Sequence, residues 1–176
     1  MTRLIGHSAL LVALFVAALG VVLAPIGVKR ARQDLVRAMY SATYAMFALV
    51  TAATFAMIYA LVTHDFSVGY VAQVGSRATP LFYTIISLWG ALEGSILFWA
   101  WVLTLLSALV VFWNRDREGA LIPYTTMTML SVSVFFLILL AGPADPFTLI
   151  SPTPPDGPGP NPLLQNHILM GVHPPL

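Results

Sequence analysis

Long apolar runs without charged side chains alternate with short charged segments along this sequence. Four of these runs are long enough to cross the hydrocarbon core of a bilayer, which takes about 20 helical residues. They cover residues 4–28, 38–64, 94–114 and 119–144. The pattern predicts four transmembrane helices, over about residues 5–27, 39–62, 95–113 and 120–141.

A shorter uncharged run lies between the second and third predicted spans. Residues 78–92 carry no charge, but a run of this length is typical of a helix at the membrane surface rather than a span. Thr79 suits a helix N-cap ahead of a proline in the first turn. The glycines of segment 89–95 predict a break before the next span, so we expect a surface helix over about 80–90. Upstream, the polar and apolar alternation of 64–71 predicts a short extended element.

Composition supports a membrane protein and removes several classes of function. Of 176 residues, 59% are hydrophobic and 9% are charged, which is far too apolar for a soluble domain. The net charge of +1 leaves no basic face for nucleic acid. The absence of cysteine excludes disulfides, thiolate metal ligands and thiol exchange in this chain. The sequence therefore predicts an all-α integral membrane protein with about four transmembrane helices, a short interfacial helix and a proline-rich tail.

The basic residues predict how the chain is oriented in the membrane. Two loops, 29–37 and 114–118, hold six of the eight basic side chains: Lys29, Arg30, Arg32, Arg37, Arg115 and Arg117. Positive charge favours the cytoplasmic side, so the N-terminus, the 65–93 loop and the tail are expected outside. The first run could instead be a secretory signal. A retained helix is favoured because its dense basic patch follows the apolar run, whereas a signal peptide carries its charge before it.

Glycine and proline at 142 and 143 divide the chain into two parts. Residues 1–142 are expected to form the transmembrane region, and residues 143–176 an extracytoplasmic segment, here called the tail. Prolines forbid regular helix over much of the tail, but they also restrict its backbone, so docking it costs little entropy.

His173 is the residue best suited to chemistry. A neutral imidazole can bind haem iron as an axial ligand, and the prolines that follow bias the backbone of His173 towards an extended conformation. From spacing alone, however, a single histidine in a proline-rich loop is more often a surface residue. His167 has the same two interpretations. Glu93 is either a membrane-edge carboxylate or part of a site, and Arg77 could pair with Glu93 or attract a haem propionate.

Several segments resemble one known family, the CcmF haem lyases of cytochrome c maturation and their NrfE relatives. The similarity lies in Asp145-Pro146-Phe147, residues 152–157 and residues 161–175. The segment 89–95 with Phe98-Trp99 also resembles a tryptophan and glycine motif of the family, although Ala91 departs from its glycine-rich pattern.

The resemblance implies a function for the candidate residues. His173 would be an axial ligand of haem iron, one of a pair of outer histidines. A wall of the haem or partner site would come from Trp89, Glu93, Trp99, Asn161, Gln165 and Pro174. The substrate would be haem b, delivered by the chaperone CcmE, and further partners would be apocytochrome c and CcmH/CcmI-type subunits in the bacterial inner membrane.

On this resemblance, the chain is expected to be the N-terminal part of a haem lyase subunit that promotes haem attachment outside the membrane. The family's tryptophan-rich loop, second outer histidine and two membrane histidines for a permanent haem lie further along a longer chain. We therefore expect no activity without that part or a partner chain. The alternative is a non-catalytic scaffold or transporter fragment that docks a partner through its tail. Transport favours charged or broken helices near the bilayer midplane, and Glu93 lies near an edge.

Overall fold

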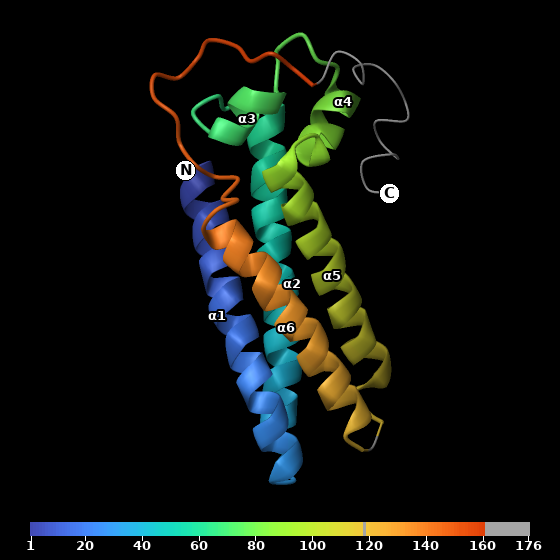
Figure 1. The fold of residues 1–176 in the computed structure, drawn as a ribbon. Coiled ribbons are helices and arrows are strands. Elements are labelled where there is room, and N and C mark those ends of the chain that lie inside the picture. Colours follow the sequence, from blue (N-terminus) through green and yellow to red (C-terminus); the bar gives the residue numbers. More distant parts are fainter. Residues whose placement is uncertain (118, 161–176) are drawn as a thin grey trace.

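The computed structural model describes residues 1–117 and 119–160, and every regular element in them is helical. Four long helices form a bundle: α1 (Thr2–Lys29), α2 (Gln33–Val62), α5 (Leu92–Asn114) and α6 (Leu121–Ala141). Three short elements, α3 (Gly69–Val74), α4 (Leu81–Ile86) and the 3-10 helix η1 (Ser87–Trp89), lie at one end of it (Figure 1). The predicted all-α membrane fold is confirmed.

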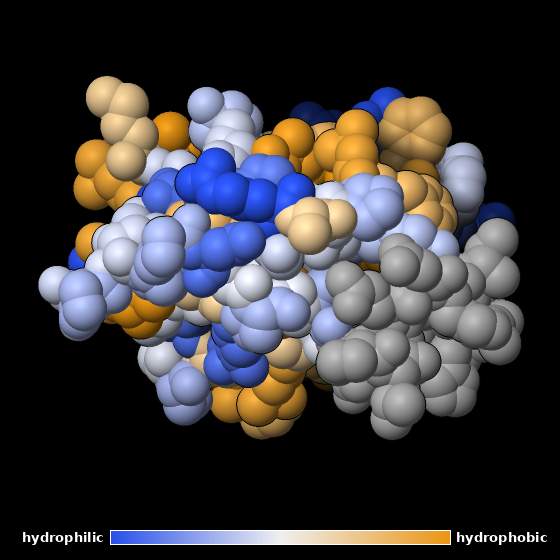
Figure 2. All heavy atoms as spheres, turned by 90° about the horizontal axis from the view of Figure 1, so that it is seen from above, coloured by the Kyte–Doolittle hydropathy of each residue, from blue (hydrophilic) through white to orange (hydrophobic). Residues whose placement is uncertain are grey.

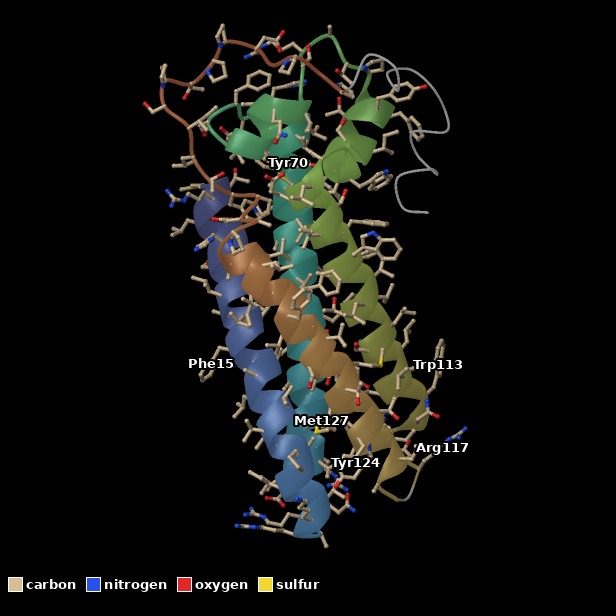
Figure 3. All side chains as sticks on the ribbon, in the orientation of Figure 1. Phe15, Tyr70, Trp113, Arg117, Tyr124 and Met127 are labelled. Atoms are coloured by element: carbon tan, nitrogen blue, oxygen red, sulfur yellow. The ribbon has the colours of Figure 1, made fainter. Side chains whose placement is uncertain are left out.

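The long helices have the surface expected of membrane spans. All four are long and apolar enough to cross a bilayer. Large apolar side chains on them are more than half exposed, among them Phe15, Phe55, Phe112 and Phe135. Phe15 and Trp113 point away from the bundle in Figure 3. Seen along the bundle, hydrophilic side chains cover the middle of one end and hydrophobic ones gather at its edge (Figure 2). A lipid environment accounts for this distribution.

Small residues let the first helix pack closely. The buried face of α1 includes Gly6, Ala13, Ala17, Gly20, Ala24 and Gly27. Gly20 lies so close to Leu130 of α6 that an added Cβ would stand 2.8 Å from a leucine methyl carbon. Close approach through small residues is the usual way in which membrane helices associate. The first apolar run is thus part of the packed core.

The serine and threonine hydroxyl groups of α6 are satisfied within their own helix. Each side-chain oxygen donates a hydrogen bond of 2.8–3.0 Å to the carbonyl four residues earlier, in Thr125, Thr126, Thr128, Ser131 and Ser133. This removes the unsatisfied polar groups that a lipid environment penalises.

Two local predictions at the end of the bundle that carries α3 and α4 are wrong. The expected extended element over 64–71 is reduced to one bridge between Val68 and Leu149, and α3 begins at Gly69. Tyr70, Val71 and Val74 face the core at helical spacing, so burial overrides the apparent alternation. Thr79 does not cap α4: the N-cap is Pro80, without a side-chain cap bond.

Two helical segments, α4 and η1, occupy the range 80–90 where a surface helix was expected, and the helical structure is interrupted before Leu92.

The described part of the tail folds back over this end. Gly69 N–H donates to Thr148 O at 2.7 Å, Ile150 N–H to Ser67 O at 3.1 Å, and Gly159 N–H to Gly75 O at 3.0 Å. These bonds tie the tail to the segment around α3, and Figure 1 shows both beside the N-terminus. We call this the tail end of the bundle, and the opposite end, with residues 30–32, 115–117 and 119–120, the basic end.

Candidate functional site

The break between η1 and α5 is organised by one tyrosine. Tyr70 of α3 is 3% exposed, and its hydroxyl lies 2.9 Å from both the Ser87 and the Leu88 carbonyl oxygens, to which it donates. The same oxygen accepts a hydrogen bond from the Ala91 N–H at 3.3 Å. Burial raises the pKa of Tyr70 well above its ordinary value, so the hydroxyl stays protonated and remains a donor. Tyr70 therefore satisfies backbone groups that the helix break would leave unpaired.

Glycine at 94 is required by the same arrangement. A Cβ there would overlap the Leu88 carbonyl oxygen and the Tyr70 hydroxyl. Ser95 donates from Oγ to the Trp89 carbonyl at 3.0 Å, and Ala91 is the N-cap of α5. The hydrogen bonds of Tyr70 to Leu88 and Ala91, together with that of Ser95 to Trp89, thus fix the backbone around Trp89.

Trp89 forms one wall of an aromatic pocket. Its ring centroid lies 4.8 Å from that of Phe98, and the Phe98 and Trp101 centroids are 6.3 Å apart. The pocket has a volume of about 210 Å³. Its lining is almost wholly apolar: Thr54, Phe55, Ile58, Leu88, Trp89, Phe98 and Trp101. This volume is below the usual 300–1,000 Å³ of enclosing ligand sites, so the pocket suits the edge of a flat apolar molecule rather than all of it.

Trp101 is held in place by a side chain of α2. Its Nε1–H donates to Thr51 Oγ1 at 3.1 Å. This bond fixes the plane of the indole across the α2–α5 contact, so the aromatic pocket is largely formed in advance.

Glu93 lies in the first turn of α5 and is half-buried. Its Oε2 is buried and has no hydrogen-bond partner among residues 1–117 and 119–160. The N-terminus of α5 favours a negative charge there, but a buried carboxylate oxygen without a partner is still costly. Such a group, four residues after Trp89, is the described polar feature best suited to bind a ligand or a partner.

Trp89 and Trp99 were predicted to belong to the same site wall, but they have different surroundings in the structure. Trp99 is 45% exposed and does not line the aromatic pocket, although its ring contacts Phe98 at a centroid distance of 6.2 Å. Trp101 lines the pocket beside Phe98, and neither Trp101 nor Tyr70 was among the predicted site residues. The spacing of three between Phe98 and Trp101 was the available signal, since such residues share a helix face.

Arg77 contacts the tail instead of forming the predicted ion pair with Glu93. Its backbone N–H donates to Asp156 Oδ1 at 3.0 Å, and its Nε–H to the Pro155 carbonyl at 3.3 Å. Its guanidinium carbon lies 5.5 Å from the centre of the Phe66 ring. Arg77 therefore fastens the tail to the α3 segment, and no ion pair with Glu93 forms in the described part of the chain.

Two histidines lie near the tail end. His7 Nδ1 is 3.0 Å from Asp145 Oδ2, which is an ion pair when the imidazole is protonated, although the angle is not that of a hydrogen bond. His64 has a buried Nε2 with no partner among the described residues, and its ring lies 5.9 Å from Phe66. No group of three or more metal-ligating side chains occurs within residues 1–117 and 119–160.

The remaining predicted site residues cannot be placed. Asn161, Gln165, His167, His173 and Pro174 lie outside the described residues.

Comparison with known proteins agrees with this architecture. A family model described as cytochrome C assembly protein matches residues 89–176, half of the chain. The chain is 34% identical over 173 residues to the cytochrome c-type biogenesis protein CcmF of Pseudomonas aeruginosa, covering 98% of this chain and 26% of that protein. It is 33% identical over 172 residues to CycK of Rhizobium meliloti, covering 98% and 25%.

A third relative, NrfE of Haemophilus influenzae, is 30% identical over 151 residues, covering 85% of this chain and 24% of that protein. The solved structure of cytochrome c heme lyase CcmF matches with a TM-score of 0.84 and 30% identity, over 98% of this chain and 27% of that one. The chain thus spans about a quarter of the length of the relatives it matches. From the matched family model, these relatives and the shared fold, the chain belongs to the CcmF, NrfE and CycK family of cytochrome c biogenesis proteins.

Proposed function

We propose that this chain is the N-terminal part of a haem lyase subunit in a bacterial inner membrane and handles haem at its tail end. Haem is the substrate, and attachment joins a cysteine thiol of apocytochrome c to a haem vinyl group. The sulfur–carbon bond forms as the vinyl double bond is lost, and the thiol hydrogen passes to the other vinyl carbon. The protein's task is then to hold haem in one orientation.

The aromatic pocket is the observation that carries this proposal. Flat rings of Trp89, Phe98 and Trp101 offer apolar surface to a porphyrin edge. Tyr70, Gly94 and Ser95 fix the backbone that presents Trp89. Glu93 adds a carboxylate oxygen without a partner in the described residues. Similarity to CcmF supports haem as the molecule bound.

His173 is proposed as the axial ligand of haem iron, with Asn161, Gln165 and Pro174 beside it and Trp89, Glu93 and Trp99 as further candidates for the wall. The tail would face the extracytoplasmic side, in line with the basic loops at the opposite end. Membership of the family supports partners of the Ccm system: a haem chaperone such as CcmE, apocytochrome c, and CcmH/CcmI-type subunits.

The test is haem retention by the complex that this chain forms with its membrane partners. We expect His173→Ala to remove the Soret absorbance of haem held at the tail end, because the iron loses an axial ligand. His167→Ala is the matched control, since it removes an imidazole from the same segment and should leave the absorbance unchanged.

Two outcomes would count against the proposal. Full haem occupancy in His173→Ala would exclude the ligand role of His173. A complex with no Soret band in the unaltered chain would favour the alternative of a non-catalytic scaffold, which has no reason to retain haem.

A further inference from the structure

A large cleft lies at the basic end of the bundle, far from the aromatic pocket. Its volume is about 1020 Å³. Its walls are formed by the end of α1, the first three turns of α2, the loop after α5 and Pro123 of α6. In Figure 1 α6 crosses in front of α2 and ends beside the start of α1.

The described lining of this cleft is basic. Arg37 comes from α2, and Arg115 and Arg117 come from the loop after α5. Figure 3 shows the Arg117 side chain extending outwards from this loop. Asp116 is the one carboxylate among the described lining residues. Its side chain is 94% exposed and only 3.8 Å from Arg115 Nε. Three arginines and one aspartate give the described lining a net positive charge, which attracts an anion.

Hydroxyl groups stand deeper in the same cleft. Tyr40 is 8% exposed and lines it together with Ser41 and Tyr44. The hydroxyl oxygen of Tyr44 is buried and has no hydrogen-bond partner within the described part of the chain. An unsatisfied buried hydroxyl in an apolar helix is costly, and a ligand oxygen in the cleft would satisfy it.

The depth of the cleft indicates what kind of anion it takes. Tyr44 lies about 16 Å along α2 from Gln33, at a rise of about 1.5 Å per residue. Val28, Val36 and Pro123 line the cleft with apolar surface between the mouth and this depth. A small free anion would use only the arginines. A phospholipid would place its phosphate among them and its glycerol and acyl carbons along the apolar wall.

We propose that this basic cleft binds the headgroup of an anionic phospholipid. The guanidinium groups of Arg37, Arg115 and Arg117 surround the phosphate, and the Tyr44 hydroxyl donates to a glycerol ester oxygen. Arginine suits this role because its planar group donates two parallel bonds to phosphate oxygens. Basic pockets between transmembrane helices on the cytoplasmic side commonly hold such headgroups, and the acyl chains would remain in the bilayer.

The test uses the whole chain in detergent, with dioleoylphosphatidylglycerol, dioleoylphosphatidylcholine and inorganic phosphate as the three probes. We expect the anionic lipid to be retained in native mass spectra and the zwitterionic lipid to be lost. The triple variant Arg37→Gln, Arg115→Gln, Arg117→Gln should weaken retention by roughly fivefold for each arginine removed. Tyr44→Phe should weaken it severalfold without any change of charge.

Lys29→Gln with Arg30→Gln is the matched control, since both residues are basic and lie at the same end but do not line the cleft. Equal loss of lipid in this control would overturn the site in favour of general surface charge. Displacement of the lipid by inorganic phosphate at equal concentration would show that the site takes a free anion instead. Unchanged retention in Tyr44→Phe would remove the hydroxyl from the site and overturn the proposed depth of binding.

Discussion

The ring of Phe147 lies directly against Gly6. Phe147 is fully buried, and a Cβ added at Gly6 would overlap three of its ring carbons. The first residues after α6 are thereby held against the start of α1, with Asp145 beside His7, the residue that follows Gly6. The tail is thus anchored before its proline-rich part begins, and its starting point relative to the bundle is fixed.

Gly6→Ala should lower the free energy of unfolding by about 1–3 kcal/mol, because a methyl group forces the packed Phe147 ring to move. Thermal unfolding of the whole chain in detergent measures this. Gly142→Ala is the control of equal size, since a Cβ there meets only the Ile138 carbonyl oxygen at 3.4 Å. Equal stability of the two variants would contradict the contact.

Tyr70→Phe should cost about 1–3 kcal/mol, because the buried Leu88 carbonyl loses its donor and the Ala91 N–H loses its acceptor. The Ser87 carbonyl still accepts from the Gly90 N–H. The substitution should also loosen the break before α5, so that acrylamide quenches the tryptophan fluorescence more strongly. Tyr59→Phe removes a hydroxyl from a residue that is 63% exposed and should change both quantities little. A Tyr70→Phe protein with the stability of the unaltered chain would show that the helix break does not depend on this hydroxyl.

Glu93→Gln should raise the free energy of unfolding by about 1 kcal/mol, because a neutral amide costs less to bury than a carboxylate oxygen with no described partner. If Glu93 belongs to the haem site, the same variant should retain less haem in the assembled complex. Asp116→Asn, at a side chain that is 94% exposed, is the control for loss of charge. A fall in stability would mean that the favourable interaction of the Glu93 carboxylate with the α5 helix dipole outweighs the cost of desolvating the carboxylate.

The contact between Asp156 and Arg77 should depend on pH. Hydrogen bonds from the backbone N–H groups of Arg77 and Gly157 hold the pKa of Asp156 below its ordinary value. The unfolded carboxyl group binds a proton first as the pH falls. The contact is therefore fully present above the unfolded pKa of about 4 and is lost as the pH falls through the lower folded value.

Hydrogen exchange at the Arg77 amide checks this dependence. After correction for the intrinsic rate, protection should be high near pH 6 and should decline below about pH 4. Asp156→Asn keeps an acceptor oxygen but has no proton to gain, so its protection should stay constant over this range. An identical decline in the variant would assign the effect to another group.

The sequence alone was sufficient to predict the four long helices, because the length and the lack of charge of each run are local properties. In a bilayer such a run must form a helix to pair its backbone polar groups. It also located the break near Trp89 and Glu93, since glycines interrupt the apolar run there. It could not show that Tyr70 supports this break, because the hydroxyl and its carbonyl partners are 17 and 18 residues apart. Nor could it assign Arg77, whose partner in the tail lies 79 residues away.

The aromatic pocket and the basic cleft were decided only by tertiary structure. Phe55 and Phe98 come from separate helices, and Arg37 and Arg117 come from α2 and from the loop after α5. Their proximity depends on how α2, α5 and α6 cross. Apolar composition is nearly uniform around these helices, so periodicity does not distinguish the faces that meet lipid from those that meet protein. Close packing at small residues such as Gly6 and Gly20 determines which helix faces meet protein. It thereby determines which side chains share a site.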